Sequence, residues 1–140
     1  MARKRVIDVT SSTTTLSKNQ SGSLVVLSRA AGIVVTLPDA GRGLEYEFVV
    51  KTAVTSNRYR FVGNDSASMR GVIAQASAGG ASVLHVGDGS THIALNMYGT
   101  TSGGLIGTNL KFVCDNDGVW NVVGQNVISG GVSLDAWSTS

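Results

Sequence analysis

The chain has 140 residues, of which 42% are hydrophobic and only 14% are charged, and its formal net charge is +2. This length suits one domain with a core of its own. Three of the eleven basic residues lie within the first five positions, so the rest of the chain is close to neutral. A basic face that binds nucleic acid is therefore not expected. No apolar run approaches a membrane span, which needs about 18 residues, so no membrane contact is expected either.

The composition favours short strands and turns over helices. There are eighteen glycines and one proline, and apolar residues alternate with polar ones along about eight to ten segments that are bounded by turn residues. Such spacing is typical of an antiparallel β-sandwich of the jelly-roll type or of a small barrel, and we expect the sandwich. We expect an N-terminal arm and polar lead-in over residues 1–23, a β-sandwich domain over 24–128 and a C-terminal tail over 129–140.

The N-terminal arm is basic and covers residues 2–9. It contains Arg3, Lys4 and Arg5 and runs into a short strand that ends at Val9. The three cations either contact a negative partner surface or remain solvated, as chain termini often do.

Two strands and a turn follow. Leu24–Ser28 and Ile33–Thr36 are rich in β-branched residues, which favour strands. The segment Arg29–Gly32 lies between them and predicts a hairpin over Ser28–Thr36. Pro38–Gly41 then forms a wide turn, because proline fixes φ and glycine permits positive φ.

The next two strands carry most of the aromatic residues. Over Leu44–Val50 the aromatic side chains alternate with Glu45 and Glu47, so one face is apolar and the other carries carboxylates. Arg58–Val62 shows the same alternation. If the two strands pair across the loop that joins them, they form an aromatic layer of Tyr46, Phe48, Tyr59 and Phe61.

Two further hairpins are predicted at Asp-Gly turns. The first joins Ser82–Val86 to Thr91–Met97, and the second joins Thr108–Cys114 to Val119–Val123. After them the tail carries an isolated apolar set. It either folds back on the domain or docks on a neighbouring subunit, because an exposed tryptophan forgoes roughly 1.5–3 kcal/mol of burial. The set is Val132, Leu134 and Trp137.

Candidate chemical groups are few. His85 and His92 would be cross-strand neighbours in a symmetric first hairpin, but a metal site needs three or four ligands and no third is near in sequence. Glu45 and Glu47 share one strand face, as glycosidase carboxylates or any solvated strand face would. Cys114 lies in an apolar run, which indicates burial more than reactivity. We therefore predict no metal, no cofactor and no catalytic residue, and the chain does not look like an enzyme.

The segment Leu24–Val50 resembles modules of tailed-bacteriophage virion proteins. Its pattern is an apolar strand, Ala-Ala-Gly, a β-branched Thr-Leu-Pro, a glycine turn and an aromatic strand. The closing Gly118–Gly124, with its glycine, x, Trp, x, Val order, is similar to the strand that often ends such modules. Similar patterns occur in capsid decoration (cement or head-fibre) proteins and in fibre-associated domains, and the resemblance spans roughly residues 12–125.

This resemblance implies a structural β-sandwich subunit, typically a homotrimer, on the capsid exterior where major capsid proteins meet. It carries over no catalytic residues. The partner contacts that we expect are in the arm, at Arg3, Lys4 and Arg5, and in the tail, at Val132, Leu134 and Trp137.

The alternative is a receptor- or glycan-binding module of a tail fibre or spike. Sugar sites often place an exposed aromatic ring beside Asp or Asn. Tyr98 near Asn96, or Trp120 near Asn121, would provide that pair.

Overall fold

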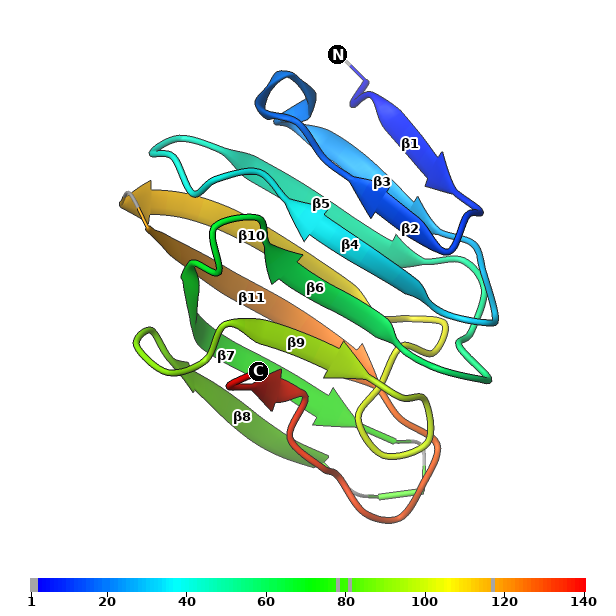
Figure 1. The fold of residues 1–140 in the computed structure, drawn as a ribbon. Helices are drawn as coiled ribbons and strands as arrows, with labels where there is room; N and C mark the ends of the chain where they lie inside the picture. Colours follow the sequence, from blue (N-terminus) through cyan, green and yellow to red (C-terminus); the bar gives the residue numbers. More distant parts are fainter. Residues whose placement is uncertain (1–2, 78, 81, 117) are drawn as a thin grey trace.

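The computed structural model describes residues 3–77, 79–80, 82–116 and 118–140. Ala2, the first residue of the predicted arm, lies outside them. Within the described residues the regular structure is β-strand, apart from one short 3-10 turn at Lys18–Gln20 (η1). The strands form two sheets that pack face to face (Figure 1). The two-layered β-sandwich that the sequence predicts is therefore confirmed.

Sheet A is the larger layer and sheet B covers its inner face (Figure 1). The order of strands in sheet A is β1 (Val6–Val9), β3 (Ser23–Leu27), β5 (Glu45–Val50), β10 (Asn109–Asn116), β11 (Val119–Val127), β7 (Ser68–Ala76) and β8 (Ser82–Asp88). The order in sheet B is β12 (Trp137–Ser138), β9 (Ala94–Met97), β6 (Tyr59–Gly63), β4 (Ile33–Leu37) and β2 (Thr13–Thr15).

The first six strands alternate between the two sheets and wind as a coil. Odd-numbered strands lie in sheet A and even-numbered strands in sheet B, so neighbours within a sheet run parallel. β7 is also parallel to β11. Five parallel pairs thus stand beside five antiparallel ones. The antiparallel pairing that the sequence predicts therefore holds for half of the pairs, and the sheets are mixed because the turns of the first half cross between sheets instead of reversing within one.

The predicted hairpin over Ser28–Thr36 is wrong for this reason. Its two strands are β3 and β4, which lie in different sheets. The turn between them includes Gly32, whose φ is +89°, and a Cβ there would lie 2.5 Å from the backbone oxygen of Arg58. The glycine that signals a hairpin in the sequence instead lets a corner pass against the start of β6.

The second predicted Asp-Gly hairpin is confirmed. β10 and β11 run antiparallel, with Lys111 opposite Val123. β10 also pairs antiparallel with β5, where Lys111 lies opposite Glu47. A strand from the last third of the chain therefore sits in the middle of sheet A, between the coil and the remaining strands.

The first predicted Asp-Gly hairpin is wrong. β8 pairs with β7 in sheet A, whereas β9 pairs with β6 and β12 in sheet B. The Asp88 carboxylate accepts the backbone N–H groups of Ser90, Thr91 and His92 at 2.8–3.1 Å. These bonds stabilise a wide loop that carries the chain from one sheet to the other, where a two-residue turn would have kept both strands in one sheet.

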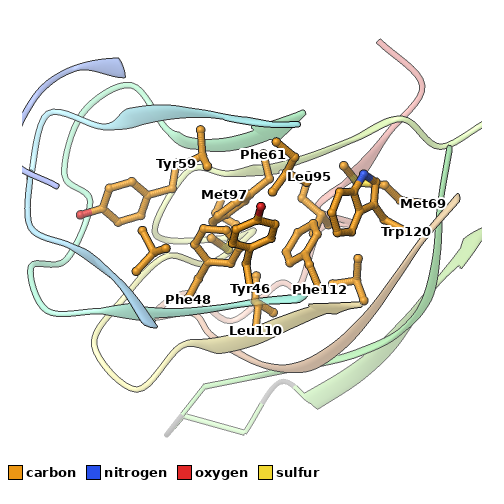
Figure 2. Close-up of a cluster of buried hydrophobic side chains, with 14 of the residues drawn as sticks. Tyr46, Phe48, Tyr59, Phe61, Met69, Leu95, Met97, Leu110, Phe112 and Trp120 are labelled. Atoms are coloured by element: carbon orange, nitrogen blue, oxygen red, sulfur yellow. The ribbon is translucent and has the colours of Figure 1, made fainter. Parts of the chain in front are cut away.

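Aromatic side chains from both sheets meet in the core, among leucine and methionine side chains (Figure 2). The ring centroids of Phe48 and Phe61 are 4.8 Å apart, and those of Phe48 and Phe112 are 5.2 Å apart. β5 and β6 do not pair, so the predicted aromatic layer forms across the interior between the two sheets. Cys114 is buried here with 1% of its surface exposed, as expected, and its thiol donates to the backbone oxygen of Val119.

The tail folds back on its own domain. β12 pairs with β9, and Trp137 is only 6% exposed. Its indole N–H donates to the backbone oxygen of His85 at 3.2 Å. A Cβ at Gly87 would lie 2.7 Å from the indole ring, so this glycine makes the space that the ring fills. Of the two fates open to Trp137, the structure shows local docking.

Candidate functional site

Exposed apolar side chains gather around β8, the edge strand of sheet A. Among the residues that the structure describes, ten large hydrophobic side chains are exposed, and seven of them belong to this side of the molecule. We call the seven the β8 surface. They are Val72, Val83, Leu84, Val86, Val123, Val132 and Leu134.

Strand register brings part of the β8 surface into rows. Val72 of β7 lies opposite Val86 of β8 on one side and opposite Val123 of β11 on the other. Leu84 lies one pleat further along β8 on the same face. Leu84 is 67% exposed and Val86 is 61% exposed. The outer face of sheet A is therefore apolar over three adjacent strands.

The tail adds two exposed apolar side chains on the inner side of β8, next to the edge of the sheet. Ser133 Oγ lies 3.0 Å from His85 Nε2 of β8 and accepts from Gln75 Nε2 of β7 at 2.9 Å. The neighbours of Ser133, Val132 and Leu134, keep more than half of their surface exposed. These two predicted contact residues are therefore available to a partner. Trp137 is not, because its ring is buried, and its assignment as a contact residue is corrected.

A buried amide cluster holds this region together, and the sequence analysis did not identify it. Asn126 is 1% exposed, and its side chain accepts from the Gly104 N–H at 3.0 Å. It donates to the Ser102 backbone oxygen at 2.7 Å and to Gln75 Oε1 at 3.2 Å. Gln75 donates in turn to the Leu134 backbone oxygen at 2.7 Å. With both amides satisfied, the cluster fixes a loop and the tail. The sequence did contain a signal for this cluster, because Gln75 of β7 and Asn126 of β11 are amide residues at positions that point into the sandwich.

The basic arm lies along the opposite edge of sheet A. Lys4 forms an ion pair with Glu47, with 3.2 Å between Nζ and Oε2. Arg5 donates to the Asn19 backbone oxygen at 3.3 Å, and Arg3 is exposed. Two of the three predicted contact cations thus already have partners within the chain, far from the β8 surface in the strand order.

The two histidines and the two glutamates do not assemble into reactive sites. His85 faces Ser133, whereas His92 Nδ1 accepts the Asp88 N–H at 3.1 Å. Glu45 lies 3.8 Å from the ammonium of Lys111 on the solvent side of sheet A. In the described part of the chain no three His, Cys, Asp or Glu residues are grouped to hold a metal ion.

A hollow opens at one end of sheet B. Its volume is about 440 Å³, and Tyr98 on its rim is 52% exposed. Trp120, the other predicted sugar-binding aromatic, is fully buried and cannot contact a glycan. We call this site the Tyr98 hollow. It is lined by Ser12, Arg29, Ala31, Gly32, Ile33, Val34, Asn57, Arg58 and Tyr98.

No protein-family model matches the sequence, and comparisons with curated proteins and with solved structures find no match either. Over the described residues, no helix has the length and apolar character needed to cross a membrane. The function is therefore inferred from the surface chemistry of the fold.

Proposed function

We propose that the chain is a structural virion protein, a capsid decoration protein that binds the outside of a phage head and bridges major capsid subunits. The β8 surface is the observation that supports this most. Contiguous exposed apolar patches are uncommon on monomeric proteins and often mark protein-binding sites. The resemblance of Leu24–Val50 to phage virion modules supplies the class of partner.

The framework and the contact surface occupy different parts of the molecule. Most of the residues that carry the resemblance build β3, β4 and β5 in the coil, and the closing Gly118–Gly124 runs into β11. The β8 surface lies at the far end of sheet A, beyond β10, on β11, β7, β8 and the tail. A partner can therefore bind at β8 without disturbing the coil, and this arrangement suits a subunit that is attached to a shell.

The proposed mechanism is adhesive. Burial of apolar area contributes roughly 25 cal/mol for each Å² removed from water. A subunit that spans the junction between capsid proteins adds this energy to their own contacts and opposes the pressure of packed DNA. Assembly into a homotrimer would present three such surfaces at once and raise the overall avidity. In this proposal the basic arm, with Arg3 nearest its free end, makes a secondary contact with the capsid.

The test compares two exposed valines on the two edges of sheet A. Val86 on β8 is 61% exposed and Val6 on β1 is 59% exposed. We expect Val86→Asp, alone or with Leu84→Asp, to lower occupancy on decoration-free heads at least tenfold, because a carboxylate would be buried without a partner. Val6→Asp should bind nearly as well as the unaltered chain. Occupancy is measured by electron microscopy of the particles and by co-sedimentation.

Two results would contradict the proposal. Equal occupancy by all variants would remove the β8 surface from the contact, and a loss with Val6→Asp alone would move the contact to the arm. Light scattering of the free variants adds a further control. If Val86→Asp changes the oligomeric mass, the β8 surface joins copies of the chain and does not face the capsid.

A further inference from the structure

The Tyr98 hollow has the size and the lining of a small-molecule site. Its volume of about 440 Å³ lies within the range of ligand pockets, roughly 300–1,000 Å³. Val34 and the Tyr98 ring provide apolar surface, while Arg29 and Arg58 provide cationic hydrogen-bond donors. Among the described residues, no carboxylate side chain lines the hollow.

The surrounding sheet leaves these cations uncompensated. None of the five strands of sheet B, as the structure describes them, contains Asp or Glu. In the described part of the chain, no carboxylate side chain forms an ion pair with Arg29, Arg58 or Arg60. Burial, and after it the charge of Arg58, lower the pKa of Arg60. The site therefore combines positive charge with no internal counter-ion.

The two lining arginines are held in place with most of their donors free. Arg58 Nη1 donates to the Tyr98 hydroxyl, and the guanidinium lies 5.6 Å from the centroid of the same ring. Arg29 Nη1 donates to the Gly32 backbone oxygen at 2.8 Å. A guanidinium carries five N–H donors, so each arginine can still make a two-pronged contact with an oxyanion.

We infer that the Tyr98 hollow binds an acidic saccharide. The carboxylate of the sugar accepts from Arg58 and Arg29, where a planar guanidinium matches its two oxygens. The apolar face of the sugar ring packs on the exposed Tyr98 ring and on Val34. Asn57 and Ser12 lie on the rim, where they can bond hydroxyl groups. This site is on the other sheet from the β8 surface and does not depend on the capsid role.

The test uses the full chain with matched acidic and neutral probes. Sialyllactose carries a carboxylate and lactose does not, and binding of each is measured by calorimetry and by protein NMR shifts. We expect saturable binding of sialyllactose and at least tenfold weaker binding of lactose. Arg58→Gln should weaken sialyllactose binding at least tenfold. Arg70→Gln, at an arginine on sheet A outside the hollow, should leave binding unchanged.

Tyr98 separates a saccharide site from a simple anion site. Tyr98→Ala should weaken sialyllactose at least tenfold and leave binding of inorganic phosphate nearly unchanged. A sulfated disaccharide tests whether the oxyanion must be a carboxylate. The inference is overturned if lactose binds as well as sialyllactose, if sialyllactose does not bind, or if Tyr98→Ala and Arg58→Gln have no effect. Thermal unfolding of each variant shows that the fold is retained.

Discussion

The outer faces of the two sheets differ in their chemistry, although both sheets present their inner faces to the same core. The strands of sheet A contain five acidic residues and two basic ones, and the β8 end of its outer face is apolar. The charges on this face lie in pairs, such as Lys4 with Glu47 and Arg70 with Asp115. The strands of sheet B contain one basic residue, Arg60, and no acidic one.

This difference shows that the alternation which builds a sandwich leaves the outward positions free for other uses. On sheet A, Glu45, Glu47 and Asp115 each pair with a cation, and the apolar β8 end of the outer face is suited to a protein partner. Next to sheet B, Arg58 forms no ion pair with a described carboxylate and can contact a ligand, whereas Arg60 donates to Asn96 and to the Ser140 oxygen. Each face therefore supports a different binding hypothesis, and the two can be tested separately.

The largest effect is expected from a substitution that weakens the contact between the two sheets. Trp137 of β12 packs on β8, so it joins the edge of sheet B to the edge of sheet A. Trp137→Ala should lower the free energy of unfolding by about 3–5 kcal/mol, because it leaves a large cavity. Tyr98→Ala, which removes an exposed ring, should change it by less than about 0.5 kcal/mol. Guanidinium unfolding measures both, and similar values would contradict the role given to Trp137.

The next prediction perturbs sheet A alone. Gly71 has a φ of +136°, and a Cβ there would lie 1.9 Å from the Val122 backbone oxygen of β11. Gly71→Ala should destabilise the protein by about 2–3 kcal/mol through strain and overpacking. Gly131→Ala is the control, because nothing lies within 4 Å of a Cβ at that position.

Gly71→Ala also separates the two faces. It should weaken binding at the β8 surface and leave sialyllactose binding at the Tyr98 hollow unchanged. Calorimetry of the folded fraction checks the second part. If Gly71→Ala weakens both binding at the β8 surface and sialyllactose binding, the two faces are not independent.

A smaller effect on stability is expected when an arginine on each face is replaced by glutamine. Arg70 pairs with Asp115 at 3.1 Å and donates to Asn121 at 2.7 Å. Arg70→Gln should cost less than about 1 kcal/mol at low salt, and part of this cost should disappear at high salt because exposed ion pairs are screened. Arg58→Gln should show no such reduction, since no carboxylate faces Arg58 among the described residues. Thermal unfolding at two ionic strengths measures the difference.

The smallest effect is a dependence on pH. Bonds from the Thr91 hydroxyl and then from the Ser90 and Thr91 backbone N–H groups lower the pKa of Asp88 below its ordinary value of 3.8. A lowered pKa means that the stabilisation is complete above pH 3.8 and is lost as the pH falls below it. The amide of Asn121, and to a lesser extent Arg70, lower the pKa of Asp115 in the same direction. Asp88→Asn should therefore lose less stability than the unaltered chain between pH 5 and pH 2, measured by unfolding at each pH.

The sequence predicted which side chains are buried better than it predicted which strands are neighbours. A period of two places Tyr46 and Phe48 on the inner face, and the structure agrees. The same alternation does not predict which other strand pairs with it in the sheet. Arg29–Gly32 and Gly87–Ser90 look like hairpin turns in the sequence, yet each crosses from one sheet to the other. The hairpin that joins Thr108–Cys114 to Val119–Val123 was correct because these two strands do pair with each other, although Asp117 in its turn lies outside the described residues.

The candidate sites were predicted only in part. Val132 and Leu134 were identified because an apolar set after a glycine break stands out, but the burial of Trp137 depends on the space above Gly87, which local pattern does not reveal. Leu84 and Val86 were assigned to a strand without regard to exposure. Their exposure could have been predicted, because the segment Ser82–Val86 carries apolar residues on both faces of the strand. That pattern is expected where a partner covers the outer face. Tyr98 and Arg58 meet only because β6 and β9 pair.

The position of β10 has a consequence for synthesis of the chain. When the coil from β1 to β6 has left the ribosome, β5 still lacks β10, its partner on the other side. Until residues 109–116 emerge, β5 keeps a bare edge that could recruit strands from other nascent chains. Premature termination before this strand would therefore release a fragment prone to aggregate, and slow translation of the last third would prolong that hazard.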